Sequence, residues 1–87
     1  MPYVEIYTKA FCPYCARAKA LLDRKGIAYE EHDITMGGPQ RAEMVTRADG
    51  ASTVPQVFIG STHVGGSDDL AAADRSGELD RMLAAAA

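Results

Sequence analysis

The sequence predicts an α/β fold in which helices flank a four-stranded mixed sheet, in the order βαβαββα. Short β-rich segments alternate along the chain with segments whose apolar residues recur at helical spacing. A helix separates the first two predicted strands, which favours a parallel pair, whereas a tight hairpin joins the last two, which must be antiparallel. With 87 residues, the chain has room for a single domain, over residues 1–87, built around one core.

The first half of the chain predicts a strand, a helix and a second strand. Residues 3–8 are β-rich, with apolar and polar side chains in alternation. Residues 13–25 predict an amphipathic helix that ends at Gly26, and residues 27–34 predict the second strand. The apolar stripe of the helix consists of Tyr14, Ala18, Leu21 and Leu22. Strands on either side of one helix are expected to be sheet neighbours, joined by a right-handed crossover.

The second half predicts a helix, a hairpin and a closing helix. A proline at the first position suits a helix over residues 39–48. Residues 56–59 and 62–64 predict two short strands, and the Gly60-Ser61 connection contains the glycine expected of a tight hairpin. Residues 67–83 predict one closing helix, which begins at a capping serine followed by two aspartates in its first turn.

Charge and composition argue against several classes of partner. The formal net charge is -3, and acidic and basic residues are interspersed, so no basic face is available for nucleic acid or membrane lipid. The N-terminal residues lack the charged and apolar regions of a signal peptide, and no apolar run approaches the length of a membrane span. We therefore expect a cytoplasmic protein with no nucleic-acid partner and no membrane partner.

The two cysteines, Cys12 and Cys15, lie where the first predicted strand gives way to the first predicted helix. A thiolate at a helix N-terminus faces unpaired backbone N–H groups and the positive end of the helix dipole. We therefore expect the pKa of Cys12 to lie below that of an ordinary thiol and Cys12 to be the attacking thiolate. Cys15 lies one turn inward, within reach of a disulfide and more shielded from solvent, as suits a resolving thiol.

The sequence gives less support to two other roles for the cysteines. A four-thiolate metal site needs a second cysteine pair, and the only histidines, His32 and His63, lack the spacing of a zinc-binding pair, so we expect no metal. The cysteines could also be a chance pair of small apolar residues buried in a helix. Their position at the start of the helix in a βαβ unit favours redox chemistry instead.

Three segments make the chain resemble the dithiol glutaredoxins of the small bacterial type: Cys12-Pro13-Tyr14-Cys15, Thr53-Val54-Pro55 and Gly65-Gly66-Ser67-Asp68-Asp69. The resemblance extends over nearly the full length. It implies a thioredoxin-like fold and a glutathione-dependent thiol–disulfide oxidoreductase, with glutathione as the reductant. The chain has no tryptophan, whereas thioredoxins depend on a tryptophan just before their cysteines.

The resemblance also implies a glutathione groove beside the cysteines. Thr53, Val54 and Pro55 would line it, with a cis Val54–Pro55 bond and with the Val54 backbone paired to the cysteinyl part of glutathione. Tyr14 would flank the sulfur. The alternative for Pro55 is an ordinary trans proline at the start of a strand, and the alternative for Tyr14 is simple packing.

The two ends of glutathione have their own implied residues. The γ-glutamyl end would be held at the start of the closing helix, by Gly66, Ser67, Asp68 and Asp69. A helix N-terminus suits an anion. Lys9 would meet the glycyl carboxylate, with help from Arg41. The alternatives are a solvated charge for Lys9 and stabilisation of the first helical turn for the two aspartates.

The implied reaction begins when the Cys12 thiolate attacks the glutathione sulfur of a glutathionylated protein and forms a Cys12–glutathione mixed disulfide. A second glutathione resolves this intermediate, whereas Cys15 resolves the intermediate formed with a protein disulfide. The expected partners are therefore glutathione and glutathionylated or disulfide-containing proteins, and the chain is expected to be a monomer. Two alternatives stay open: a thioredoxin-class reductase fed by a flavoprotein, and an iron–sulfur carrier that holds a cluster between two chains.

Overall fold

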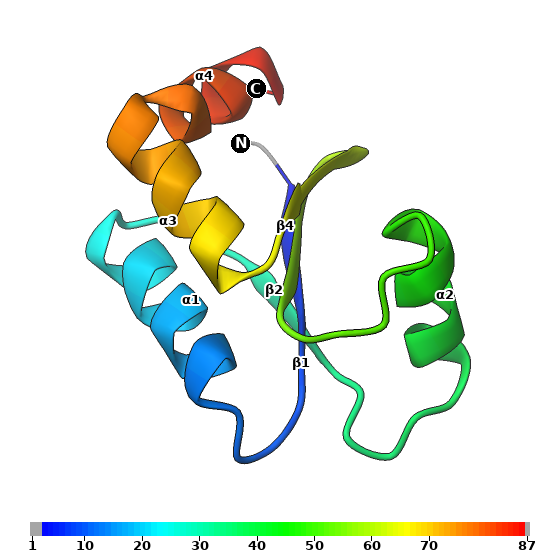
Figure 1. Cartoon of the computed structure of the whole chain (residues 1–87). Coiled ribbons are helices and arrows are strands. Elements are labelled where there is room, and N and C mark those ends of the chain that lie inside the picture. The colour runs from blue at the N-terminus through cyan, green and yellow to red at the C-terminus, as the bar shows by residue number, and fades with distance from the viewer. Residues whose placement is uncertain (1–2, 87) are drawn as a thin grey trace.

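The computed structural model describes residues 3–86, which form a four-stranded sheet and four helices (Figure 1). The elements, in chain order, are β1 (Val4–Thr8), α1 (Pro13–Arg24), β2 (Glu30–Asp33), α2 (Pro39–Arg47), β3 (Gln56–Ile59), β4 (Thr62–Gly65), α3 (Ser67–Ser76) and α4 (Glu78–Ala86). The sheet order is β2-β1-β3-β4. β1 and β2 are parallel, whereas β3 is antiparallel to both β1 and β4. The predicted mixed sheet is therefore confirmed.

Helices cover both faces of this sheet: α1, α3 and α4 lie on one face and α2 on the other (Figure 1). Along β1, Val4 and Ile6 belong to the core on the α1 and α3 side, whereas Tyr7 belongs to the core beneath α2. The larger cluster consists of Val4, Ile6, Ala18, Leu21, Leu22, Val57, Ile59, Leu70 and Leu79. The smaller cluster consists of Tyr7, Ile34, Met44, Ala48 and Phe58. Because helices cover both faces of β1, all five of its residues are buried.

The second strand is shorter than expected. β2 covers only Glu30–Asp33, whereas the sequence predicts a strand over residues 27–34. Ile27 and Tyr29 pack against the larger core cluster from the connection that leads into β2. The backbone N–H of Ile27 donates to the carbonyl oxygen of Leu22 at 3.0 Å, so this segment is tied to the end of α1 rather than to β1.

The closing helix is two helices, so the observed order is βαβαββαα instead of βαβαββα. The single helix expected over residues 67–83 breaks at Gly77, which has a φ of 84°. This left-handed conformation is the usual end of a helix and favours glycine, which has no Cβ to clash. Within residues 3–86, no helix combines the length and the apolar character that crossing a membrane requires.

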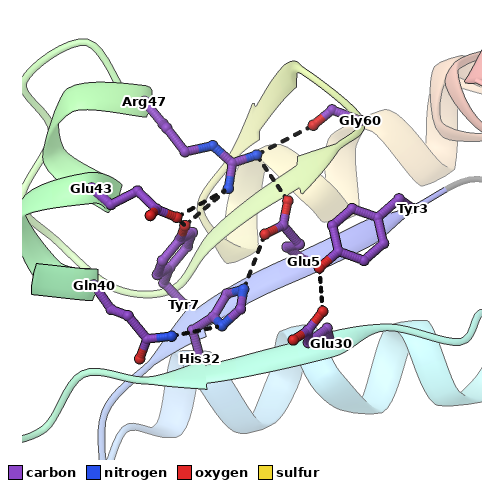
Figure 2. A network of polar contacts seen from close by, with 9 residues as sticks. All are labelled: Tyr3, Glu5, Tyr7, Glu30, His32, Gln40, Glu43, Arg47 and Gly60. Carbon is purple, nitrogen blue, oxygen red and sulfur yellow. Dashed lines mark hydrogen bonds and ion pairs between the residues drawn. The ribbon is translucent and has the colours of Figure 1, made fainter.

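Polar contacts help to hold α2 on its face of the sheet (Figure 2). Arg47, in the last turn of α2, donates from Nη2 to Glu5 Oε2 and from Nη1 to Tyr7 Oη, both at 2.9 Å. The other Glu5 oxygen, Oε1, lies 3.0 Å from His32 Nε2. Burial alone would raise the pKa of Glu5, but hydrogen bonds from Arg47 and His32 outweigh it and lower the pKa. A buried carboxylate in β1 is thus satisfied by partners from α2 and β2.

Candidate active site

The two cysteines lie at the N-terminus of α1 and are joined by a disulfide. Cys12 is the N-cap residue, with extended backbone, and Pro13 follows it at the first helical position. The backbone N–H of Cys15 donates to Cys12 Sγ at 3.1 Å. First-turn N–H groups have no acceptor within their own helix, so the start of α1 supplies a donor to this sulfur. The same donor would stabilise a Cys12 thiolate when the pair is reduced.

Burial distinguishes the two cysteines. Cys15 is 2% exposed and belongs to the interior, whereas Cys12 is half-buried. A disulfide in solution can therefore approach Cys12 more easily than Cys15. This difference agrees with the predicted division into an attacking and a resolving thiol.

A surface cavity of about 330 Å³ opens beside Cys12. Three segments line it, from the start of α1, the loop before β3 and the start of α3: Tyr14, Thr53, Val54, Pro55, Gly66, Ser67, Asp68 and Asp69. Cys12 Sγ lies 4.0 Å from the carbonyl oxygen of Val54, which places the sulfur at the edge of the cavity. The Val54–Pro55 bond is cis, as the resemblance implied. The fold thus gathers into one cavity eight residues that the sequence analysis named as groove residues.

The two cationic residues predicted to meet the glycyl carboxylate lie outside this lining. Lys9 directly follows β1 and is half-buried. Arg41 is exposed in the first turn of α2, where its backbone N–H donates to Gly38 O at 3.1 Å. Their contact with a ligand therefore stays a prediction. Within the described residues, no three His, Cys, Asp or Glu side chains cluster so that they could hold a metal ion.

The start of α3 has a distinctive geometry. The N-cap residue is Gly66 and not Ser67, which the sequence predicted, and the Gly66 backbone N–H donates to Asp69 Oδ2 at 3.0 Å. Gly65, with a φ of 117°, precedes it, and a Cβ at this position would lie 2.9 Å from the Cβ of Asp69. The close approach of Asp69 therefore requires glycine at position 65. Both aspartates are exposed, and of the two Asp69 is the one that accepts this hydrogen bond.

Three residues near the cysteines or the loop before β3 were not predicted as part of the site. Phe11 is fully exposed directly before Cys12 and has a φ of 56°. Gln56 is 4% exposed and bonds to Thr53, and His63 bonds to Gln56 in turn. Two features of the sequence could have indicated them: Phe11 is an aromatic residue next to the reactive cysteine, and Gln56 is a polar residue at the start of an apolar strand.

Comparisons with known proteins agree with this geometry. The family model described as Glutaredoxin matches residues 4–64, which include both cysteines and the loop before β3. Glutaredoxin of Pseudomonas aeruginosa is 54% identical over 85 residues, covering 98% of this chain and 100% of its own. Glutaredoxin 3 of Escherichia coli K12 is 53% identical over 83 residues, covering 95% of this chain and 99% of its own.

Solved structures of glutaredoxins are also similar to this chain. The crystal structure of a buckwheat glutaredoxin–glutathione complex matches with a TM-score of 0.84 at 32% identity. The match covers 98% of this chain and 79% of that chain. The expected thioredoxin-like fold, with its four-stranded mixed sheet, is therefore confirmed.

Proposed function

The chain belongs to the glutaredoxin family of glutathione-dependent thiol–disulfide oxidoreductases, and we propose that Cys12 is its attacking thiolate and binds glutathione in the adjoining cavity. The observation that carries this proposal is the position of Cys12. Its sulfur receives a first-turn N–H and lies 4.0 Å from Val54 O, at the edge of a cavity of about 330 Å³. The glutathione bound by the buckwheat relative supports glutathione as the ligand.

The proposed reaction on glutathionylated clients has two exchanges. The Cys12 thiolate attacks the glutathione sulfur, the client–glutathione S–S bond breaks, and the client leaves as a thiolate that takes a proton from water. A glutathione thiolate then attacks the glutathione sulfur of the Cys12 adduct. This second exchange releases the Cys12 thiolate and forms oxidised glutathione.

Client proteins with disulfides follow a branch through Cys15. Cys12 attacks one client sulfur, and Cys15 then attacks the Cys12 sulfur and releases the client as a dithiol. The product is the Cys12–Cys15 disulfide, with the pairing seen in the structure. Two glutathione molecules reduce it again. Fully exposed Phe11, directly before Cys12, is placed to meet such a client as it approaches.

We assign the γ-glutamyl end of glutathione to the start of α3. The N-cap Gly66 has no side chain to bond first-turn N–H groups, so those of Ser67 and Asp68 are available to a carboxylate. Because Asp69 already accepts from Gly66, Asp68 is the carboxylate that faces the ammonium. Thr53, Val54 and Pro55 form the opposite wall, and Tyr14, half of which is exposed, flanks the sulfur.

The remaining parts of the proposal concern the glycyl end and the cellular setting. Lys9, together with Arg41 on α2, supplies positive charge to the glycyl carboxylate. The protein works as a cytoplasmic monomer, with glutathione and client proteins as its partners, and it uses no metal, nucleic acid or membrane.

Turnover of a glutathionylated peptide tests the proposed function. The assay supplies glutathione, glutathione reductase and a reduced nicotinamide cofactor, and follows oxidation of the cofactor. Wild-type protein should turn the peptide over, and Cys12→Ser should not, because a serine hydroxyl is not appreciably ionised at neutral pH. Reduction that proceeds with a flavoprotein thioredoxin reductase but not with glutathione would contradict the proposal.

A further inference from the structure

We propose that Gln56 and His63 are positioning residues. They act through Thr53 to hold the backbone of the loop before β3, residues 53–55, in the orientation that binds glutathione. This inference rests on the proposed function, because it takes the Val54 backbone as a contact of glutathione. Neither Gln56 nor His63 lines the cavity. Their effect on the ligand must therefore pass through the loop.

The first contact is a double hydrogen bond from Gln56 to Thr53. Gln56 Nε2 donates to the backbone oxygen of Thr53 at 3.0 Å and to its Oγ1 at 3.2 Å. Gln56 is the first residue of β3 and is 4% exposed, so water does not readily replace these bonds. The buried amide therefore ties the exposed end of the loop to the sheet.

Holding Thr53 also orients Val54, because one planar peptide joins them. Among residues 3–86 the only cis bond is Val54–Pro55, so the Thr53–Val54 peptide is trans. In a trans peptide the carbonyl and the following N–H point in opposite directions within one plane. A Thr53 carbonyl fixed on Gln56 therefore fixes the direction of the Val54 N–H. Within the described residues no hydrogen bond occupies this N–H, which leaves it available to a ligand.

His63 determines which way the Gln56 amide faces. The Thr53 carbonyl can only accept, so the amide group turned toward it is the NH₂ and the Gln56 oxygen faces His63. The two atoms, Gln56 Oε1 and His63 Nε2, are 2.5 Å apart, so His63 Nε2 carries the hydrogen and donates it. An acceptor in place of His63 would favour the flipped amide, which turns an oxygen toward the Thr53 carbonyl.

His63 is an exposed residue of β4, but one face of its ring packs on the core. It stacks on Phe58, with ring centroids 4.9 Å apart and planes inclined by 25°. Phe58 is fully buried and lies opposite His63 in the β3–β4 register. The order of influence thus runs from the core through His63 and Gln56 to the loop.

Two substitutions of nearly equal size test the donor at position 63. His63→Gln keeps an NH₂ donor, whereas His63→Glu, when ionised, offers only acceptors. We expect His63→Glu to raise the KM for a glutathionylated peptide about tenfold, because the buried Gln56 amide would lose the donor for its oxygen and turn that oxygen toward Thr53. We expect His63→Gln to stay within about twofold of the wild type. Thr62→Glu, which adds the same charge at the neighbouring exposed residue of β4, controls for repulsion of anionic glutathione.

Alkylation of Cys12 by iodoacetamide, which does not need the groove, serves as the second readout and should be unchanged in all variants. Gln56→Met, which keeps the side-chain length and removes the donor, should reproduce the higher KM. An equal KM in His63→Glu and His63→Gln, or the same rise in Thr62→Glu, would overturn the proposal. So would a loss of thermal stability with an unchanged KM. If the wild type itself fails to turn over the peptide, the proposed function fails, and this role for Gln56 and His63 fails with it.

Discussion

The Sγ atom of Cys12 lies 4.0 Å from the carbonyl oxygen of Val54, although the two residues are 42 positions apart in the sequence. One belongs to the cap of α1 and the other to the loop before β3. A ligand sulfur bonded to Cys12 is therefore brought beside the backbone of that loop. The start of α3 lines the same cavity, so one small ligand can contact all three segments at once.

The N–H donor at the start of α1 has a consequence for thiol ionisation. We expect the pKa of Cys12 to lie clearly below the value of about 8.5 for an unperturbed thiol, because the Cys15 N–H reaches its sulfur at 3.1 Å. The rate of alkylation by iodoacetamide, measured against pH in reduced Cys15→Ser, reports this pKa from a single thiol. An apparent pKa of about 8.5 would contradict the proposed effect of the helix N-terminus on the Cys12 thiol.

The two aspartates of α3 should have separable roles. Asp68→Ala should raise the KM for a glutathionylated peptide about threefold, the effect of one partly exposed charge pair, and leave unfolding nearly unchanged. Asp69→Ala should lower the free energy of unfolding by about 1 kcal/mol, because it removes the acceptor of the Gly66 N–H. Enzyme kinetics together with urea unfolding of both variants checks this. The assignment is wrong if Asp69→Ala leaves stability intact while Asp68→Ala lowers it.

The buried carboxylate of Glu5 should make stability depend on pH in the acid range (Figure 2). Although burial opposes ionisation, hydrogen bonds from Arg47 and His32 lower the folded-state pKa of Glu5 below 4.5. Its ionised contribution is therefore fully present above pH 4.5 and is lost as pH falls through the folded pKa.

Glu5→Gln should accordingly lower the free energy of unfolding by about 1–3 kcal/mol at neutral pH. The difference from the wild type should shrink below pH 4.5, where the wild-type carboxyl takes up its proton. Urea unfolding of both proteins measures this difference in the free energy of unfolding. The measurements run from about pH 3 to about pH 7, a range that includes the ordinary pKa of a carboxyl group. A difference that stays constant over this range would contradict a role for the ionised group.

Much of the fold follows from local signals in the sequence. Helix α1 begins at Pro13 directly after Cys12, and α2 begins at Pro39 after two glycines; proline suits the first position of a helix. The sequence does not reveal that the closing helix breaks at Gly77, because apolar residues continue at helical spacing beyond it. The shortened β2 was hidden because Ile27 and Tyr29 are equally suited to a strand and to packing from a loop.

The site could be predicted in part, mainly through the family resemblance. The cysteine pair and the groove segments are contiguous motifs, so they are visible in the sequence. The contact from His63 to Gln56 and on to Thr53 is not, because it depends on the pairing of β3 and β4, which shifts register between Val57 and Phe58. The hydrogen bond from the Gly66 N–H to Asp69 likewise depends on backbone geometry, and the sequence of two adjacent aspartates does not show which of them accepts it.

The central claim is that glutathione becomes covalently attached to Cys12, and the Cys15→Ser variant tests it most directly. Without Cys15, the Cys12–glutathione adduct has no internal thiol to displace it and should accumulate when reduced variant meets a glutathionylated peptide. Added glutathione should clear it and sustain turnover. Reduction of protein disulfides should fall steeply, because the neighbouring thiol no longer acts at high effective concentration. Intact-protein mass spectrometry with peptide mapping is the measurement: one glutathione on Cys12 is the predicted result, and a folded variant that acquires none would contradict the account.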